Sequence, residues 1–239
     1  MNISRQFEKD LMELQIALSK KQLTQFITYY EMLAEWNQVM NLTAITDYEE
    51  VLKKHFIDSL SLVKAFDLTS DISVIDIGTG AGFPGIPLKI AFPNLKVTLL
   101  DSLNKRVQFL KAVIEKLELQ EIESFHGRAE DFARPGLMRE KYDLCVSRAV
   151  ANLTTLSEYC LPFVKVGGFF VSYKSEKIEQ EKKEAEKAIR LLGGKIEKQV
   201  ELYLPDSDIY RNLFVIKKET ACPKKYPRKA GLPAKEPLM

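Results

Sequence analysis

Hydrophobic residues recur at helical spacing through the first 70 residues of the chain. An apolar side chain at every third or fourth position forms one stripe along a helix, and that stripe packs against the rest of the protein. The run Asn41 to Thr46, NLTAIT, interrupts the spacing. We therefore expect an N-terminal helical cap over residues 1–70, with a break between helices at this run. The positions that carry the pattern include Phe7, Leu11, Leu14, Leu18, Leu23, Phe26, Ile27, Tyr30, Leu33, Val51, Phe56, Leu60 and Val63.

The pattern changes at Ser73, after which short β-rich runs alternate with helical ones. The predicted strands are SVIDI, KVTLLD, IESFH, YDLCVSRAV and GGFFVSYK; helices are predicted between them, including one over residues 152–165 and one that ends at Gly193. This alternation is typical of a parallel sheet with helices on both faces. Two last strand patterns, KIEKQVELYL and RNLFVIKK, follow each other directly, which predicts an antiparallel hairpin at the C-terminal edge. The fold class is therefore α/β over residues 71–219, followed by a tail of little regular structure over 220–239.

The first predicted strand runs into a glycine-rich turn. Gly78, Gly80, Gly82 and Gly85 follow SVIDI, and Pro84 and Pro87 flank the start of the next helix. Such a turn lies at the carboxyl end of the parallel strands, where bare backbone lies against a ligand. One glycine would satisfy a tight turn, so four favour a binding site.

Two classes of ligand compete for this turn. The letters GAGFPG from Gly80 match the dinucleotide pattern, and Asp101 follows at the spacing of a ribose-binding acid. A nicotinamide-dependent oxidoreductase therefore stays open. However, Asp76 ends the strand beside the turn, and we expect it to point into the pocket. Its carboxylate would repel a pyrophosphate but favour the ammonium and sulfonium of S-adenosylmethionine, so the methyl donor is the preferred ligand.

The composition of the chain limits which partners, metals and cellular compartments are expected. The chain has 239 residues, 46% of them hydrophobic, and a formal charge of +2, so overall charge names no nucleic-acid partner. The three cysteines lack metal-ligand spacing, and no apolar stretch is long enough to span a membrane. We therefore expect a reduced cytoplasmic protein that uses no metal and has no membrane partner; DNA binding is not expected either.

Several motifs resemble one bacterial family. DIGTGAGFPGIPLKI, HGRAEDF, VSRAVA, NLTAI, HFIDSL and YPRKAGLPAKEPL are similar to those of the glucose-inhibited division protein B family, over a stretch from Asn41 to the C-terminus. The resemblance implies a class I methyltransferase sheet of Rossmann-like type and transfer of a methyl group from S-adenosylmethionine to N7 of one guanine in 16S ribosomal RNA. The partner would be that RNA or the small ribosomal subunit. A non-catalytic RNA- or ribosome-associated module that only binds the donor remains an alternative.

The resemblance also assigns residues. It implies that Gly78, Phe83, Ala129, Glu130 and Arg148 contact the donor and that Asp101 holds its ribose. Asp76 and Gly80 are also predicted to contact the donor, because they lie in or beside the glycine-rich turn. Where the family carries a lysine-glycine pair, this sequence has Lys174 followed by Ser175.

The chemistry needs no general base. The N7 atom of guanine has a free lone pair, so positioning it in line with the methyl group can supply most of the acceleration. We assign no catalytic acid or base, and we expect His55 and His126 to be structural. Arg148 is placed to contact the donor or guanine O6.

RNA binding is expected from the C-terminal tail. From Lys217 onward seven basic residues face two acidic ones, with Tyr226 available for stacking on a base. The predicted RNA contacts are Lys174, Lys224, Lys225, Arg228 and Lys229.

Overall fold

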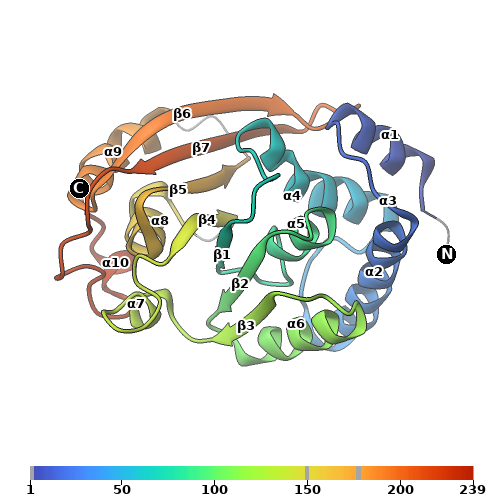
Figure 1. Cartoon of the computed structure of the whole chain (residues 1–239), viewed down its shortest axis with the longest axis horizontal. Coiled ribbons are helices and arrows are strands. Elements are labelled where there is room, and N and C mark those ends of the chain that lie inside the picture. Colours follow the sequence, from blue (N-terminus) through green and yellow to red (C-terminus); the bar gives the residue numbers. More distant parts are fainter. Residues whose placement is uncertain (1–2, 149–150, 176–178, 239) are drawn as a thin grey trace.

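A computed structural model describes residues 3–148, 151–175 and 179–238 of the chain. Its centre is a seven-stranded sheet in the order β3-β2-β1-β4-β5-β7-β6 (Figure 1). The five strands from β3 to β5 are parallel, as predicted. The strands are β1 (Ser73–Ile77), β2 (Lys96–Asp101), β3 (Ile122–His126), β4 (Tyr142–Arg148), β5 (Val164–Lys174), β6 (Gly194–Tyr203) and β7 (Tyr210–Lys218). Ala149 and Val150, predicted to extend β4, lie outside the described residues.

The hairpin predicted at the C-terminal edge is present, with β7 as its inner strand. β7 pairs antiparallel with both β5 and β6. Five consecutive residues of β7, from Asn212 to Ile216, are buried, whereas most of β6 is half-buried or exposed. A strand that is apolar on both sides belongs inside a sheet covered on two faces, which explains the order.

The N-terminal helices pack on one face of the sheet together with α5 (Gly85–Ala91) and α6 (Asn104–Lys116). Phe7, Phe26, Tyr29 and Phe56 form an aromatic cluster there, with ring centroids 5.1 to 6.4 Å apart. α2 ends at Asn41, which adopts a left-handed conformation where the break was predicted. The elements before β1 are α1 (Arg5–Glu13), α2 (Lys20–Met40), α3 (Tyr48–Val51), the π-helix η1 (Leu52–Ile57), α4 (Asp58–Leu60) and η2 (Ser61–Lys64).

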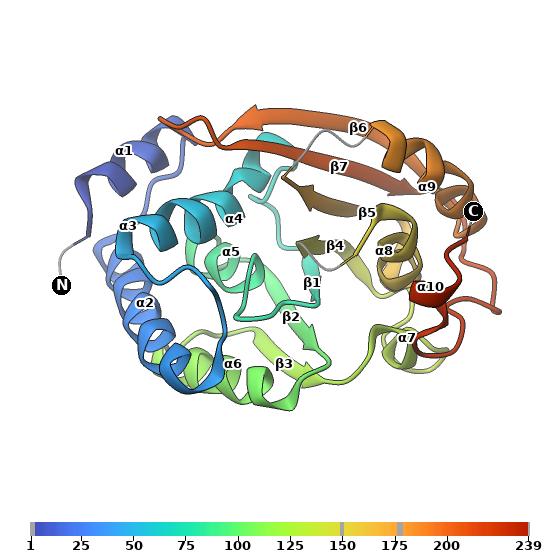
Figure 2. The same ribbon diagram turned by 180° about the vertical axis from the view of Figure 1, so that it is seen from behind.

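The opposite face is covered by α7 (Ala129–Phe132), α8 (Leu153–Cys160), α9 (Glu179–Leu191) and α10 (Leu232–Lys235) (Figure 2). The helix predicted over 152–165 is wrong in its second half. It ends at Cys160, the short 3-10 turn η3 (Leu161–Phe163) follows, and β5 already begins at Val164. Pro162 has no N–H group to continue the helix, which accounts for the early end.

The tail is packed rather than free. Cys222 and Tyr226 belong to the core on the α8 face, and α10 lies beside α8. Tyr226 is only 7% exposed, so the prediction that its ring stacks on RNA is not supported by its position. The division into cap, central domain and tail stays a prediction. Within the described residues, no helix is long and apolar enough to cross a membrane.

Candidate donor and acceptor sites

The glycine turn forms at the carboxyl end of β1. Gly78, Gly80 and Gly82 have φ values of +69°, +63° and +102°, a region that side chains disfavour. A side chain on Gly82 would also collide with Ile86 and with the hydroxyl of Tyr29. That hydroxyl donates to the carbonyl of Ala81 at 2.5 Å, so the N-terminal helix α2 holds the turn in place.

Asp76 lies beneath this turn and is fully buried. Its Oδ2 accepts hydrogen bonds from the Thr79 hydroxyl at 2.6 Å and from the Gly85 amide at 2.8 Å, whereas Oδ1 has no partner among the described residues. Burial raises the pKa of Asp76 to about 7, although the hydrogen bonds from Thr79 and Gly85 oppose the rise. One oxygen of the carboxyl therefore supports the start of α5, and the other is a buried acceptor with no partner among the described residues.

Asp101, at the end of β2, connects the turn to the neighbouring strand. Its Oδ2 accepts from the Gly80 amide at 2.9 Å, its Oδ1 accepts from the Leu103 amide at 2.9 Å, and Arg106 lies 3.5 Å away. A carboxylate has about four acceptor positions, so these three contacts leave about one of them open. His126, at the end of β3, contacts the Ser102 carbonyl, consistent with a structural role.

A first cavity of about 250 Å³ opens at the ends of β1, β2 and β3; we call it the β1–β3 cavity. Three predicted donor contacts, Gly78, Ala129 and Glu130, line it. Gly80, Phe83, Asp76 and Asp101 are not part of its lining. Its other lining residues are Ile77, Leu100, Ser102, Gly127, Arg128, Ala151, Tyr159 and Ala234.

Ala234 and Tyr159 were missed by the sequence reasoning. Neither carries a chemical signature, because they reach the β1–β3 cavity only through the packing of the tail and α8.

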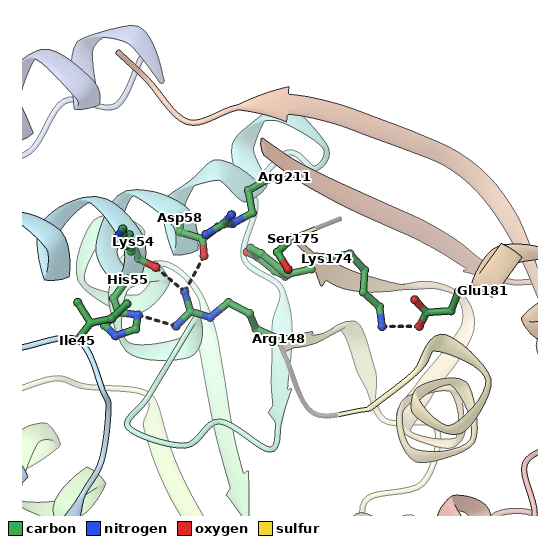
Figure 3. A pocket seen from close by; sticks show the side chains of 10 residues that line it. Ile45, Lys54, His55, Asp58, Arg148, Lys174, Ser175, Glu181 and Arg211 are labelled. Carbon is green, nitrogen blue, oxygen red and sulfur yellow. Dashed lines mark hydrogen bonds and ion pairs between the residues drawn. The ribbon is translucent and has the colours of Figure 1, made fainter. Parts of the chain in front are cut away.

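A second cavity of about 480 Å³ lies at the ends of β4 and β5, against the N-terminal helices; we call it the β4–β5 cavity (Figure 3). Arg148 projects into it. The guanidinium donates to the carboxylate of Asp58 at 2.8 Å, to the Lys54 carbonyl at 3.2 Å and to Nδ1 of His55 at 3.2 Å. The other carboxylate oxygen of Asp58 accepts from Arg211 at 2.7 Å. Asp58 and Arg211 were also missed by the sequence reasoning.

His55 is neutral at physiological pH. Burial, followed by the charge of Arg148, lowers its pKa to about 3. Since Arg148 has only donors, Nδ1 of His55 accepts, and Nε2 is left to donate to the Thr43 hydroxyl at 2.8 Å. The imidazole stacks on Phe83 at 4.5 Å, and the Arg148 guanidinium lies 5.1 Å from the same ring. His55 thus orients Arg148 and Phe83, which agrees with the structural role expected for it.

The predicted RNA contacts fall into two groups. Lys174 pairs with Glu181 at 2.6 Å and donates to the Ala151 carbonyl, on the side of the β4–β5 cavity away from Arg148 (Figure 3). Arg228 is held by Glu158. Lys224, Lys225 and Lys229 are exposed and line a groove of about 270 Å³ on the tail.

Metal chemistry receives no support from the side chains. Among residues 3–148, 151–175 and 179–238, no group of three histidines, cysteines or acidic residues is placed to hold an ion.

Comparison with known families agrees with this geometry. The family model GidB, described as rRNA small subunit methyltransferase G, matches residues 22–209. A ribosomal RNA small subunit methyltransferase G of Lachnoclostridium phytofermentans is 55% identical over 98% of this chain and 96% of its own length. The chain belongs to the GidB family. The resemblance seen in the motifs is thereby confirmed, and the nicotinamide-dependent alternative loses its support.

The fold of this GidB-family chain is similar to those of solved methyltransferase structures. A SAM-dependent methyltransferase from Aquifex aeolicus superimposes with a TM-score of 0.53, at 18% identity, and covers 74% of this chain and 96% of its own. M. jannaschii TYW2 in complex with AdoMet gives a TM-score of 0.54, at 15% identity, over 72% of this chain and 77% of its own. The predicted Rossmann-like class I methyltransferase fold is therefore confirmed for this GidB-family chain.

Proposed function

We propose that this protein transfers a methyl group from S-adenosylmethionine to N7 of a guanine in 16S ribosomal RNA, in the cytoplasm. The observation that carries the proposal is the pair of cavities at the carboxyl ends of the parallel strands in a chain of the GidB family. The β1–β3 cavity suits the donor, and the β4–β5 cavity suits the acceptor nucleotide.

The residues of the β1–β3 cavity fit the donor. Gly78 and Ala129 leave room beside the turn, while Ile77 and Leu100 offer apolar surface to a nucleoside. Two carboxyls outside the cavity lining complete the fit: Asp101 retains an acceptor position for the ribose, and Oδ1 of Asp76, which has no partner among the described residues, is a buried acceptor suited to the ammonium of a methionine group. The bound donor would supply an electrophilic sulfonium methyl group; the protein's own task is to orient it.

The β4–β5 cavity fits a guanine nucleotide. Arg148 is held rigidly by Asp58, His55 and the Lys54 carbonyl, yet a guanidinium has five N–H groups, so donors remain for guanine O6. Because His55 has a pKa of about 3, it takes up no proton at neutral pH, and N7 requires no base to attack. Rigid placement of the acceptor is therefore the main contribution expected from these residues.

The acceptor atom is tested with RNA that contains 7-deazaguanine. We expect labelled methyl transfer to unmodified 16S RNA or precursor subunits, with the product cleaved at one guanine after borohydride reduction. RNA with 7-deazaguanine lacks the N7 lone pair and should accept no label. Transfer to the substituted RNA would contradict N7 as acceptor. Donor binding without any transfer would favour the non-catalytic alternative.

The RNA-binding surface is proposed on the exposed lysines of the tail, with Lys174 and Arg228 held by acids. Replacing Lys224, Lys225 and Lys229 by serine should lower the salt slope of RNA binding by roughly 0.7 per lost phosphate contact. The matched control replaces three lysines exposed on the other face of the sheet, Lys20, Lys111 and Lys116. Equal slopes for the two variants would place the RNA elsewhere.

A further inference from the structure

The C-terminal segment 221–238, which we call the C-terminal strap, leaves β7 and runs to the β1–β3 cavity past α7 and α8. Figures 1 and 2 show α10 beside both helices from the two sides. The first half of the C-terminal strap is anchored by Arg139. The guanidinium donates to the carbonyls of Tyr226 at 2.7 Å, Cys222 at 2.5 Å and Pro223 at 3.3 Å. Three contacts from one side chain fix this backbone to the body of the protein.

The middle of the strap is fixed by a buried ion pair. Glu158, on α8, has a side chain only 1% exposed and accepts from the backbone amide and the guanidinium of Arg228 at 2.7 to 3.2 Å. A second guanidinium contact, from Arg228 to the Glu236 carbonyl at 2.7 Å, folds the end of the strap back on itself. Thr155 also donates to the Pro233 carbonyl at 3.3 Å. A buried carboxylate is costly without its partner, so Glu158 requires Arg228 in this position.

The end of the strap reaches the donor contacts themselves. The amide of Gly231 donates to Oε1 of Glu130 at 2.8 Å, and Glu130 is only 4% exposed. Gly231 has φ +82°, which a side chain would disfavour. Three residues further on, Ala234 stands in the lining of the β1–β3 cavity, together with Ala129 and Tyr159.

From these contacts we infer that the C-terminal strap is one wall of the methyl-donor site, which orients Glu130 and borders the nucleoside with Ala234. The inference rests on the proposed function, since it presumes that the β1–β3 cavity takes the donor. It gives Arg228 and Glu158 the role of positioning residues: they touch no ligand, but they hold the wall that does. The tail therefore serves donor binding as well as any RNA contact that its lysines make.

The first test enlarges the wall. Ala234→Leu adds bulk at the rim of the cavity, and Lys235→Leu adds the same group one position further on, outside the lining. With S-adenosylhomocysteine as the probe in calorimetry, we expect Ala234→Leu to bind roughly tenfold more weakly and Lys235→Leu to bind like the unaltered protein. Ala234 is exposed, so both variants should unfold at the same temperature as the parent.

The second test loosens the wall without filling the cavity. Glu158→Gln keeps the shape of the side chain but removes the charge that holds Arg228; the control is Glu115→Gln, at an exposed position of α6. We expect several-fold weaker binding of S-adenosylhomocysteine only for Glu158→Gln, and faster proteolysis of the strap.

The outcomes separate the two ideas. If the unaltered protein binds the probe and both Ala234→Leu and Glu158→Gln bind it equally well, the strap is no wall, and the proposed function stands. If the unaltered protein fails to bind the probe, the proposed donor site and the inference are both overturned.

Discussion

If Asp76 meets the donor as proposed, its buried carboxyl should make donor binding depend on pH. Burial raises its pKa to about 7, with Asp101 adding to the rise and Arg148 opposing it, so only about half of the unliganded protein carries the charge at neutral pH. The ammonium of the donor favours the ionised carboxylate. Binding should therefore release a proton, and affinity should increase as pH rises.

The size of the effect follows from the ionised fraction. With a pKa of about 7, that fraction is about one tenth at about pH 6 and about three quarters at about pH 7.5. If only the ionised form holds the ammonium, affinity increases about eightfold over this interval, which is ~1.2 kcal/mol. His55, with a pKa of about 3, stays neutral throughout and does not contribute.

Calorimetry with two ligands isolates this effect. S-adenosylhomocysteine carries the ammonium and should show the eightfold increase; methylthioadenosine lacks the amino acid and should show none. Asp76→Asn keeps an acceptor for the Gly85 amide but cannot ionise, so its affinity for either ligand should be flat. An equal pH dependence for both ligands, or a flat one for S-adenosylhomocysteine, would refute the role given to Asp76.

Three further substitutions test the site and its support. Asp101→Asn removes a charged acceptor of ribose hydroxyls and should weaken S-adenosylhomocysteine binding by about 1.5 to 3 kcal/mol, measured by calorimetry; unchanged affinity would take Asp101 out of the site. Asp58→Asn takes the countercharge from two arginines and should lower the free energy of unfolding by about 3 to 5 kcal/mol in urea; a loss below about 1 kcal/mol would contradict a buried triad. Gly85→Ala would overlap Leu99 and crowd Asp76, so thermal unfolding should show a loss of about 1 to 3 kcal/mol; an unchanged melting temperature would show that the turn yields.

The sheet and the turn could be predicted because their signals are local. SVIDI and KVTLLD are short apolar runs bounded by turn residues, and they became β1 and β2 at the predicted residues. Gly78, Gly80 and Gly82 adopt positive φ values that only glycine adopts easily, so their spacing marks the bend. The position of Asp101 could be predicted as well, because the carboxyl ends of neighbouring parallel strands lie side by side and Asp101 ends the strand next to β1.

The partners of the charged residues could not be predicted. Asp58 meets Arg148 and Arg211 across 90 and 153 positions of sequence, and Glu158 meets Arg228 across 70. In the sequence alone, each of these residues is a charged type that is usually found exposed on the surface. The helix over 152–165 failed differently, because its apolar periodicity continued past Pro162 while the backbone did not.

The distribution of these partners divides the basic residues near the cavities into two kinds. Arg148 and Arg211 are held by Asp58, Lys174 by Glu181 and Arg228 by Glu158, so their net charge is largely compensated where they stand. Such residues fix geometry, and their loss should appear in stability, donor affinity or rate at any salt concentration. Lys224, Lys225 and Lys229 are exposed on the strap, so any attraction between them and the phosphates of a bound RNA would act through the solvent, where salt screens it. High salt should therefore mask the effect of replacing an exposed lysine of the strap, but not the effect of replacing a basic residue that is paired with an acid. This difference separates positioning residues from residues that attract RNA, without knowledge of the bound RNA.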